Sequence, residues 1–501
     1  MALRPREWKL EREVSTTVQP RPAQRRRTFR PAPPVMPKAD AAATKASAAR
    51  SGDPSAAPSV DRTVVFTALW ALAQLGHILR KENPADPLTW VWFFAAFALL
   101  IRPRSVYRVA ILALVQLFYL SGELPRTDNH AYIMGFVHLG LLVAVIFGDR
   151  ERFRLPERYL CTTVVLSYAA AAIAKLNSAF FDPALSCAVE MFYNATGAVG
   201  LEPGGAPWLE PVLPFVIATV ELLVPLSLLV PRTRRAGVVL LVVFHWGMSL
   251  SPTATAVDFT LLLFPLAVLF LPPRAATELR GWFRRALERL PASARHGPVP
   301  PAVVFLVLSA ALITRWGPAG NANWVLLAPT AFVVGAALIG AAFTVPESGR
   351  PSKRAWPSPA RAALVGLVLL QVLNVSAPYL GLKTVGSYIM YSNLQTEMRS
   401  SNHWILPRLP IDGPLDDFVE IIHSSNPELL RLRDQGELIS FHEMRRQLRR
   451  DPGASVRYSR GGVLIEHAEA REDPDLVGGS TLLNTLIGHR AYDPNHAACR
   501  W

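Results

Sequence analysis

Cysteine is scarce in this sequence, and the short motifs of several large enzyme classes are missing. Of 501 residues only three are cysteines, Cys161, Cys187 and Cys499, and their spacing indicates neither a metal-binding motif nor a disulfide framework. The sequence also contains no HExxH, no phosphate-binding loop, no GxSxG and no CxxC. These absences argue against a zinc protease, a P-loop nucleotidase, a serine hydrolase and a thioredoxin-like enzyme. We expect no metal site.

Acidic residues are also few, and the basic residues are unevenly placed. The chain has 38 Asp and Glu against 52 Lys and Arg, a formal net charge of +14. The basic residues crowd the N-terminal tail and alternate loops and form no aromatic-interleaved surface, which argues against a nucleic-acid partner. Residues 1–60 are rich in Pro, Ala and Arg and lack any period. We expect a disordered basic tail that meets the lipids of an anionic cytoplasmic leaflet.

Apolar residues dominate the sequence after this tail. They make up 51% of the chain, and the mean hydropathy is +0.24, values typical of a polytopic membrane protein. We predict an all-α polytopic membrane helical bundle of about nine to eleven transmembrane helices over residues 61–377. The apolar runs behind this prediction cover residues 63–79, 88–101, 107–121, 131–148, 159–176, 211–230, 236–250, 257–272, 300–315, 323–345 and 361–377.

The loop arginines predict how this bundle is oriented. If the N-terminus is cytoplasmic and every run crosses, the inside loops hold most of the basic loop residues, and the outside loops hold only Arg80, Lys81, Arg126 and Arg315. The positive-inside rule then predicts an integral protein of the cell inner membrane with a cytoplasmic N-terminus. Residues 274–290 repeat apolar side chains at helical spacing opposite arginines, which predicts an interfacial helix on the cytoplasmic face.

Residues 378–501 have the composition of a soluble segment, and this topology places them on the outer or periplasmic face. DFVEIIHSS alternates like a half-buried strand. Ser440 and Glu443 form a capping box at the start of a helix. VRYSRGGVLIEH is typical of two short strands joined by a Gly-Gly turn. We therefore predict a small extramembrane α+β domain.

Lys175 is a basic residue inside the apolar run 159–176. A charged side chain at the centre of a bilayer costs about 2.5–3.5 kcal/mol on insertion scales, so such residues tend to be functional. A desolvated lysine loses its proton more readily than a solvated one, which suits a general base. A lysine near a helix end can instead extend its ammonium group to the interface. Both interpretations stay open at this point.

Other polar residues interrupt the apolar runs. Glu221, four residues before Pro225, must be paired or protonated, and either a backbone hydrogen bond near the proline or a place in a site accounts for it. His245 is either a satisfied core histidine or a member of a site. Asn129 and His130 begin the run 131–148, where they cap a helix or face Lys175 in one pocket. Tyr168 lies two turns before Lys175 on the same helix face and could line that pocket.

Four segments together resemble the vitamin K-dependent gamma-carboxylase family and its bacterial relatives, the HTTM (horizontally transferred transmembrane domain) membrane proteins. TDNHAYIMGF, which contains Asn129, His130 and Tyr132, looks like the Asn-His-x-Tyr stretch of that family. AIAKLNSAFFDP is similar to its lysine-bearing helix end. The other two segments are VELLVPLSLLVPRTRRAGVVLLVVFHWGMS, which ends in the histidine helix, and GSYIMYSNLQTEMRSSNHWIL, which follows the last predicted helix. The resemblance covers roughly residues 60–405.

This resemblance implies a chemistry for the site. The matching lysine, Lys175, is the base that deprotonates vitamin K hydroquinone, a menaquinol or phylloquinol, and O2 converts the quinol to an epoxide. In the carboxylases this oxidation is coupled to proton removal from a glutamate-containing peptide and addition of CO2. His130 and Asn129 then orient the quinol oxygen, and Tyr168, Tyr132, Glu221 and His245 line the quinol pocket. A neutral lysine in a dry pocket is also what abstraction of a phenolic proton requires.

The sequence also departs from the animal carboxylases. Its outer segment is short, whereas those enzymes carry a large luminal domain, and a single lysine stands where they have a Lys-Lys pair. Arg399 and His403, with Glu397 and Asn402 nearby, form either an outer lid over the pocket or a solvated connector. A non-catalytic membrane protein that binds a lipid or isoprenoid, and a small-molecule transporter with Glu221 and His245 as a proton relay, are the alternative functions.

Overall fold

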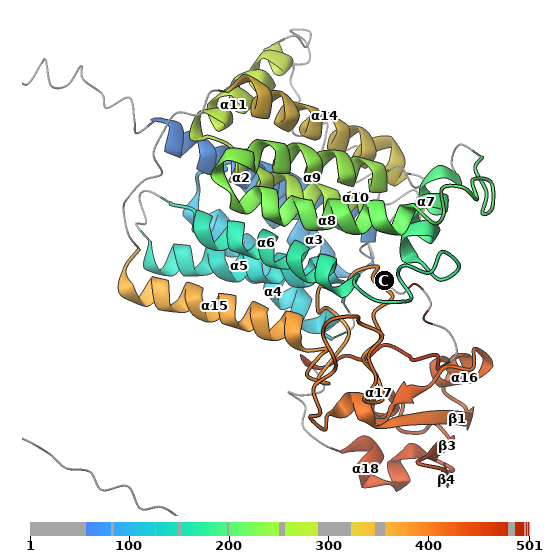
Figure 1. Ribbon diagram of the computed structural model, residues 1–501. Coiled ribbons are helices and arrows are strands. Elements are labelled where there is room, and N and C mark those ends of the chain that lie inside the picture. Colours follow the sequence, from blue (N-terminus) through green and yellow to red (C-terminus); the bar gives the residue numbers. More distant parts are fainter. Residues whose placement is uncertain are drawn as a thin grey trace, which may run out of the picture. The chain divides into compact units, whose positions relative to one another are not determined.

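The computed structural model describes residues 57–81, 85–125, 127–148, 153–197, 200–249, 256–288, 322–345, 356–478, 486–494, 497 and 499. Nearly all of the tail predicted to be disordered, residues 1–60, lies outside these described residues, as does the apolar run 300–315. Within them the chain is mainly helical, with a small antiparallel sheet near the C-terminus (Figure 1).

Every apolar run within the described residues forms a helix. Local signals set some of the boundaries, since the Asp86 carboxylate caps α3 by accepting from the Leu88 amide, and Pro87 takes the first helical position. The amphipathic helix predicted at 274–290 is present as α11. The helices of this region are α2 (Ala57–Lys81), α3 (Pro87–Ile101), α4 (Val106–Glu123), α5 (Asn129–Phe147), α6 (Glu157–Ala174), α7 (Cys187–Thr196), α8 (Leu213–Leu229), the 3-10 helix η2 (Pro231–Thr233), α9 (Arg234–Ser249), α10 (Ala256–Val268), α11 (Pro273–Glu288), α14 (Ala322–Thr344) and α15 (Ser358–Ser376).

These helices pack into one bundle around an apolar core. Helices α4, α5, α6 and α15 lie side by side, α8 joins α6 to α9, and α2 packs against α3, α10 and α11 (Figure 1). The core is filled by large side chains such as Phe66, Trp70, Phe93 and Phe264. The outward surfaces of several helices are apolar as well, which is the surface that lipid requires. Exposed apolar side chains include Phe94, Ile111, Phe118, Leu222, Leu226, Leu369 and Leu370.

Four helical segments are long and apolar enough to cross a membrane, namely Arg62–Leu79, Val106–Glu123, Asn129–Phe147 and Ser358–Ser376. A fifth candidate is the pair formed by α8 and the segment Pro231–Ser249, which pass the same test together but are bent by 118°. Other apolar helices within the described residues are shorter. The expected number of about nine to eleven transmembrane helices therefore stays a prediction.

Gly140 of α5 lets the aromatic ring of Tyr159 on α6 approach the helix backbone. A Cβ atom added at residue 140 would lie 2.2 Å from Cε1 of Tyr159, and the Tyr159 hydroxyl is held by the Phe136 carbonyl at 2.7 Å. We expect Gly140→Ala to destabilise the protein by about 1–3 kcal/mol, the usual cost of overpacking. Thermal unfolding in detergent would measure this effect. Gly122, where an added Cβ meets no atom within 4 Å, is the control position, and equal midpoints for the two alanine variants would contradict the expectation.

The C-terminal region folds as predicted into a small α+β unit. Its four strands are antiparallel in the order β2-β1-β3-β4. The predicted strand at DFVEIIHSS is β1, and the Gly-Gly turn joins β3 to β4 with positive φ at both glycines. Ser440 Oγ caps its helix by accepting from the Glu443 amide at 3.2 Å. The elements are η3 (Pro414–Asp416), β1 (Phe418–Ser424), α16 (Pro427–Asp434), β2 (Ile439–Ser440), α17 (Phe441–Arg450), β3 (Val456–Arg460), β4 (Val463–His467), η4 (Ala470–Glu472) and α18 (Pro474–Val477).

Candidate functional site

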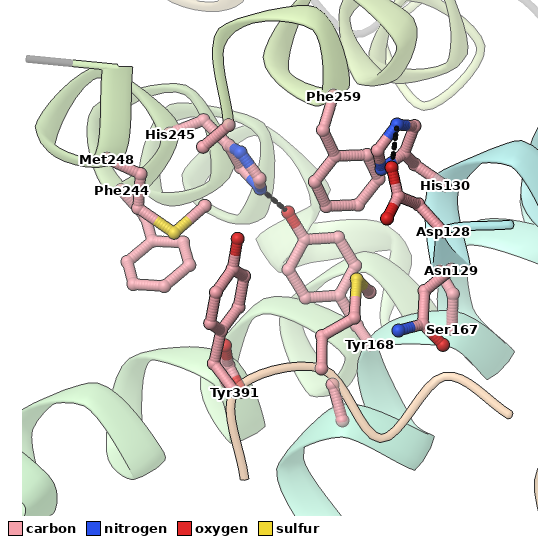
Figure 2. Close-up of a pocket in the computed structure, with 14 residues that line it drawn as sticks. Asp128, Asn129, His130, Ser167, Tyr168, Phe244, His245, Met248, Phe259 and Tyr391 are labelled. Atoms are coloured by element: carbon pink, nitrogen blue, oxygen red, sulfur yellow. Dashed lines mark hydrogen bonds and ion pairs between the residues drawn. The ribbon is translucent and has the colours of Figure 1, made fainter. Parts of the chain in front are cut away.

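A cavity of about 130 Å³ lies among α5, α6, α8, α9 and α10 (Figure 2). Five of the residues singled out in the sequence line it: Asn129, His130, Tyr168, Glu221 and His245. Apolar side chains form much of the remaining wall, among them Phe244, Met248, Phe259 and Met390. An apolar cavity of about 150 Å³ takes up a benzene ring. This cavity is therefore of the size that holds a small aromatic group with polar substituents.

Lys175 is buried next to this cavity and paired with Glu221. Its side chain follows the last residue of α6 and is 1% exposed. The ammonium nitrogen Nζ lies 2.7 Å from Oε2 of Glu221 and donates to the Met390 carbonyl at 2.8 Å. Lys175 itself does not line the cavity, whereas Glu221 does. The structure thus brings together two residues that the sequence separates by a helix, and one of them, Glu221, lines the cavity.

Pro225 removes one backbone hydrogen bond from α8 next to Glu221. A proline inside a helix has no amide hydrogen for the carbonyl four residues earlier, which here is the carbonyl of Glu221. From the sequence, the Glu221 side chain could either hydrogen bond to the backbone near Pro225 or belong to a functional site. In the structure it pairs with another candidate site residue, Lys175.

Tyr168 and His245 form a second polar pair at the cavity wall. The Tyr168 hydroxyl and Nε2 of His245 are hydrogen bonded, and Figure 2 shows the two rings meeting edge to face. The other ring nitrogen of His245, Nδ1, lies 3.4 Å from Oγ1 of Thr260. Since both side chains are buried, they fix each other's orientation. They present a phenol and an imidazole to the cavity.

His130 reaches the cavity from α5 and contacts two carboxylates. Its Nε2 lies 3.2 Å from Oδ2 of Asp258 and 3.6 Å from Oδ2 of Asp128. The same Asp258 oxygen lies 3.0 Å from Nδ1 of His77. The sequence analysis missed His77 and Asp258. Both are polar residues inside apolar runs. The same pattern identified Glu221 and His245 as candidates, so it could also have identified His77 and Asp258.

Asn129 and Tyr132 link α5 to the chain that follows α15. The Asn129 side-chain oxygen accepts from the Tyr388 amide at 2.7 Å. Tyr132 does not line the cavity. Nζ of Lys383 lies over its ring, 4.2 Å from the ring centroid. Burial lowers the pKa of Lys383 to about 8. Of this pair from the Asn-His-x-Tyr stretch, only Asn129 faces the site.

The two residues proposed as an outer lid also lie away from the cavity. Arg399 is exposed and pairs with Asp412. His403 packs on the end of α6, where Nε2 meets the Ile173 carbonyl at 2.8 Å and Nδ1 accepts from two backbone amides. These partners assign a neutral imidazole with its proton on Nε2, and burial lowers the pKa of His403. Met390 and Tyr391 from the same outer segment do line the cavity.

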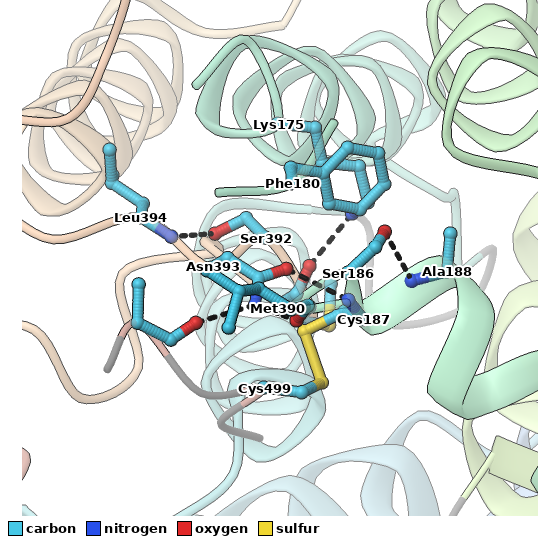
Figure 3. The surroundings of a disulfide bond; sticks show 12 residues. Lys175, Phe180, Ser186, Cys187, Ala188, Met390, Ser392, Asn393, Leu394 and Cys499 are labelled. Carbon is cyan, nitrogen blue, oxygen red and sulfur yellow. Dashed lines mark hydrogen bonds between the residues drawn. A yellow bond between two sulfur atoms is a disulfide. The ribbon is translucent and has the colours of Figure 1, made fainter. Parts of the chain in front are cut away.

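A disulfide joins Cys187, at the start of α7, to Cys499 (Figure 3). No sequence spacing predicted this bond, because 312 residues separate its two cysteines. Asn393 lies beside it and connects three segments. Its oxygen accepts from the Cys187 amide at 2.8 Å, and its nitrogen donates to the carbonyls of Leu185 and Ala497. The disulfide therefore fixes the outer segment that supplies Met390 and Tyr391.

We expect Cys187→Ser to lower the stability of the protein by about 2–5 kcal/mol, as loss of a native disulfide commonly does. The thermal midpoint in detergent should fall by a similar amount in wild type treated with a reductant. Cys161, which is a free cysteine on α6, provides the matched control. A Cys161→Ser variant as unstable as Cys187→Ser would show that the disulfide is not the cause.

A second and more polar cavity, of about 270 Å³, lies between the helical bundle and the C-terminal unit. Asp128 and Asn129 line both cavities, so these two residues form a shared wall. The second cavity is further lined by Arg431 and Arg490, together with Glu428, Glu443 and His489. Such a wall suits a polar or charged ligand that approaches Asn129 from the C-terminal unit.

Searches against models of known protein families, against curated proteins and against solved structures find no match to this chain.

Proposed function

We propose that this chain is an integral membrane enzyme that oxygenates a vitamin K-type quinol, with Lys175 and Glu221 as the proton-accepting pair. The observation that supports this most is the buried Lys175–Glu221 pair at the wall of an apolar cavity. A base in a dry site is what removal of a phenolic proton requires. The resemblance to the vitamin K-dependent gamma-carboxylase and HTTM proteins points to the same chemistry.

The pair accepts a proton in either of its charge states. When it is an ion pair, the Glu221 carboxylate takes the proton from the quinol hydroxyl. When it is neutral, the Lys175 amine takes it. In both cases the pair ends with one positive charge, which stabilises the negative charge left on the quinol oxygen in a low-dielectric site. Overall, one quinol and one O2 give one quinone epoxide and one water, so O2 is the oxidant and no other reductant takes part.

The remaining cavity residues orient the ring. The phenol of Tyr168, the imidazoles of His130 and His245 and the amide of Asn129 offer hydrogen bonds to the two quinol oxygens. Phe244 and Phe259 offer faces on which the ring stacks. The isoprenoid tail, too large for a cavity of about 130 Å³, lies outside it against the apolar surface of the helices.

Coupling to carboxylation of a glutamate-containing peptide is the second part of the proposal. The polar cavity next to Asn129 is lined by Arg431 and Arg490 as well as by Asp128, Glu428 and Glu443. Its two guanidinium groups can pair with a carboxylate, and its own carboxylates can accept from the amides of a peptide. A peptide held there approaches the quinol site through the wall formed by Asp128 and Asn129. The Cys187–Cys499 disulfide supports a periplasmic position for this end of the bundle, because such bonds persist in oxidising compartments.

The proposal is tested by measuring epoxide formation in purified, detergent-solubilised protein that is supplied with O2 and either phylloquinol or menaquinol. Wild type is expected to form epoxide, and addition of a glutamate-containing peptide with labelled CO2 then tests carboxylation. A folded wild-type protein that forms no epoxide from either quinol would reject the enzyme function. Extraction and identification of bound lipid from the same preparation would then test the isoprenoid-binding alternative.

A further inference from the structure

Three buried side chains from three separate helices converge beside the quinol cavity. They are His77 from α2, His130 from α5 and Asp258 from α10, and their exposed fractions are 3%, 7% and 0%. One ligand atom from each lies within 4.8 Å of the other two. The proposed function uses His130 only to orient the quinol ring and gives no role to His77 or Asp258, so it does not account for the cluster.

The separations of the two histidines from Asp258 fit metal coordination. Oδ2 of Asp258 lies 3.0 Å from Nδ1 of His77 and 3.2 Å from Nε2 of His130. Two ligand atoms that bind one ion at about 2.1 Å, with angles of roughly 90–110° between the bonds, lie roughly 3.0–3.4 Å apart. The two histidines therefore stand at the distances from the carboxylate that a shared ion sets.

The chemistry of the three ligands indicates the class of metal. Two imidazoles and one carboxylate form the facial set that binds Fe²⁺ in non-haem enzymes, and similar sets bind Zn²⁺, Mn²⁺ and Co²⁺. Hard ions such as Mg²⁺ and Ca²⁺ prefer oxygen ligands. Three protein ligands leave coordination positions open, and His130 lines the cavity. Figure 2 shows the Asp128 carboxylate next to the His130 ring, 3.6 Å from Nε2, where it can hold a metal-bound water.

We infer that His77, His130 and Asp258 bind one divalent transition-metal ion at the edge of the cavity. This inference goes beyond the proposed function, because proton removal by Lys175 and Glu221 needs no metal. It also differs from the sequence-based expectation of no metal site. Residues 77, 130 and 258 lie on separate helices, so no local spacing could show their convergence.

The test uses full-length protein in detergent, treated with a chelator and then titrated with Co²⁺. Binding at this site is expected to produce visible absorption bands with a stoichiometry of one ion per chain. Asp258→Asn, which keeps the size of the side chain, should weaken Co²⁺ binding by at least tenfold. The matched control is His138→Gln, a buried histidine of the same helix whose ring contacts Trp70 and Gln116 instead of the cluster. That variant should bind Co²⁺ like wild type.

Two results would overturn the inference. One is a folded wild-type protein that shows no Co²⁺ bands up to millimolar metal, a measurement that needs no variant. The other is equal Co²⁺ affinity in wild type and Asp258→Asn. Either result would make the cluster a hydrogen-bonded triad. Both leave the epoxidation assay untouched, so failure of the metal site and failure of the quinol chemistry are distinguishable.

Discussion

Lys175→Ala is expected to reduce epoxide formation by at least 1,000-fold, to the background of the reaction without protein. The size of the effect follows from the contribution of general-base catalysis, about 10²–10⁴-fold. It also reflects loss of the positive charge that faces the deprotonated quinol oxygen. Epoxide would be quantified by chromatography after fixed times, at quinol concentrations that saturate wild type. Lys175→Arg keeps the positive charge next to Glu221. It should retain epoxidation if the Glu221 carboxylate is the proton acceptor, and it should lose epoxidation if the Lys175 amine is the acceptor.

The matched control for this experiment is Lys383→Ala. Lys383 is also buried, and its Nζ lies over the Tyr132 ring away from the cavity. Loss of Lys383 removes a cation–π contact worth about 0.5–2 kcal/mol but leaves the Lys175–Glu221 pair intact. Epoxidation should therefore stay within a few-fold of wild type. If Lys175→Ala retains activity comparable to that of Lys383→Ala, Lys175 is not part of the base.

The second large expected effect is on the stability of the protein, when either Lys175 or Glu221 is replaced alone by an apolar residue. Removing one partner of a buried ion pair leaves an uncompensated charge and costs about 3–5 kcal/mol. We therefore expect Glu221→Leu and Lys175→Met each to lower the free energy of unfolding by about this amount. The double variant, with both groups apolar, should recover most of the loss and stay inactive. Denaturant titration of the four proteins in one detergent would give the coupling energy.

Additive losses in that cycle would contradict a direct interaction between the two side chains. The cycle also separates catalysis from folding. A double variant as stable as wild type but without epoxidation shows that the pair is required for the chemistry itself. A double variant that regains epoxidation would exclude both residues from the base.

Much of the architecture follows from patterns that act locally in the chain. The apolar runs, the Ser440–Glu443 cap and the Gly461–Gly462 turn depend on residues close in sequence, and the structure has a helix or strand at each of them within the described residues. The site is different, because its contacts join residues that are far apart. The Lys175–Glu221 pair was not predicted, since two charged groups in different helices give no spacing from which to infer a contact.

Three of the predicted site residues lie away from the cavity for a related reason. Tyr132, Arg399 and His403 were grouped with the site because they lie in the segments that resemble the family. The structure gives each of them other partners, namely Lys383, Asp412 and the Ile173 carbonyl. His77 and Asp258 were passed over although they are polar residues within apolar runs. Only the packing of α10 against both α2 and α5 shows that they belong with His130.

The Cys187–Cys499 bond has a consequence for the order in which this protein matures. Asn393, which follows the cavity-lining residues Met390 and Tyr391, accepts from the Cys187 amide of α7 and donates to the Ala497 carbonyl. The Ala497 contact and the disulfide can form only after residues 497 and 499 have been synthesised, later than the segments that carry His130, Lys175 and Glu221. A chain arrested or cleaved before residue 497 would keep its helices and the Lys175–Glu221 pair but would lack both contacts. Closing this wall of the cavity therefore depends on an oxidation step that joins α7 to residue 499.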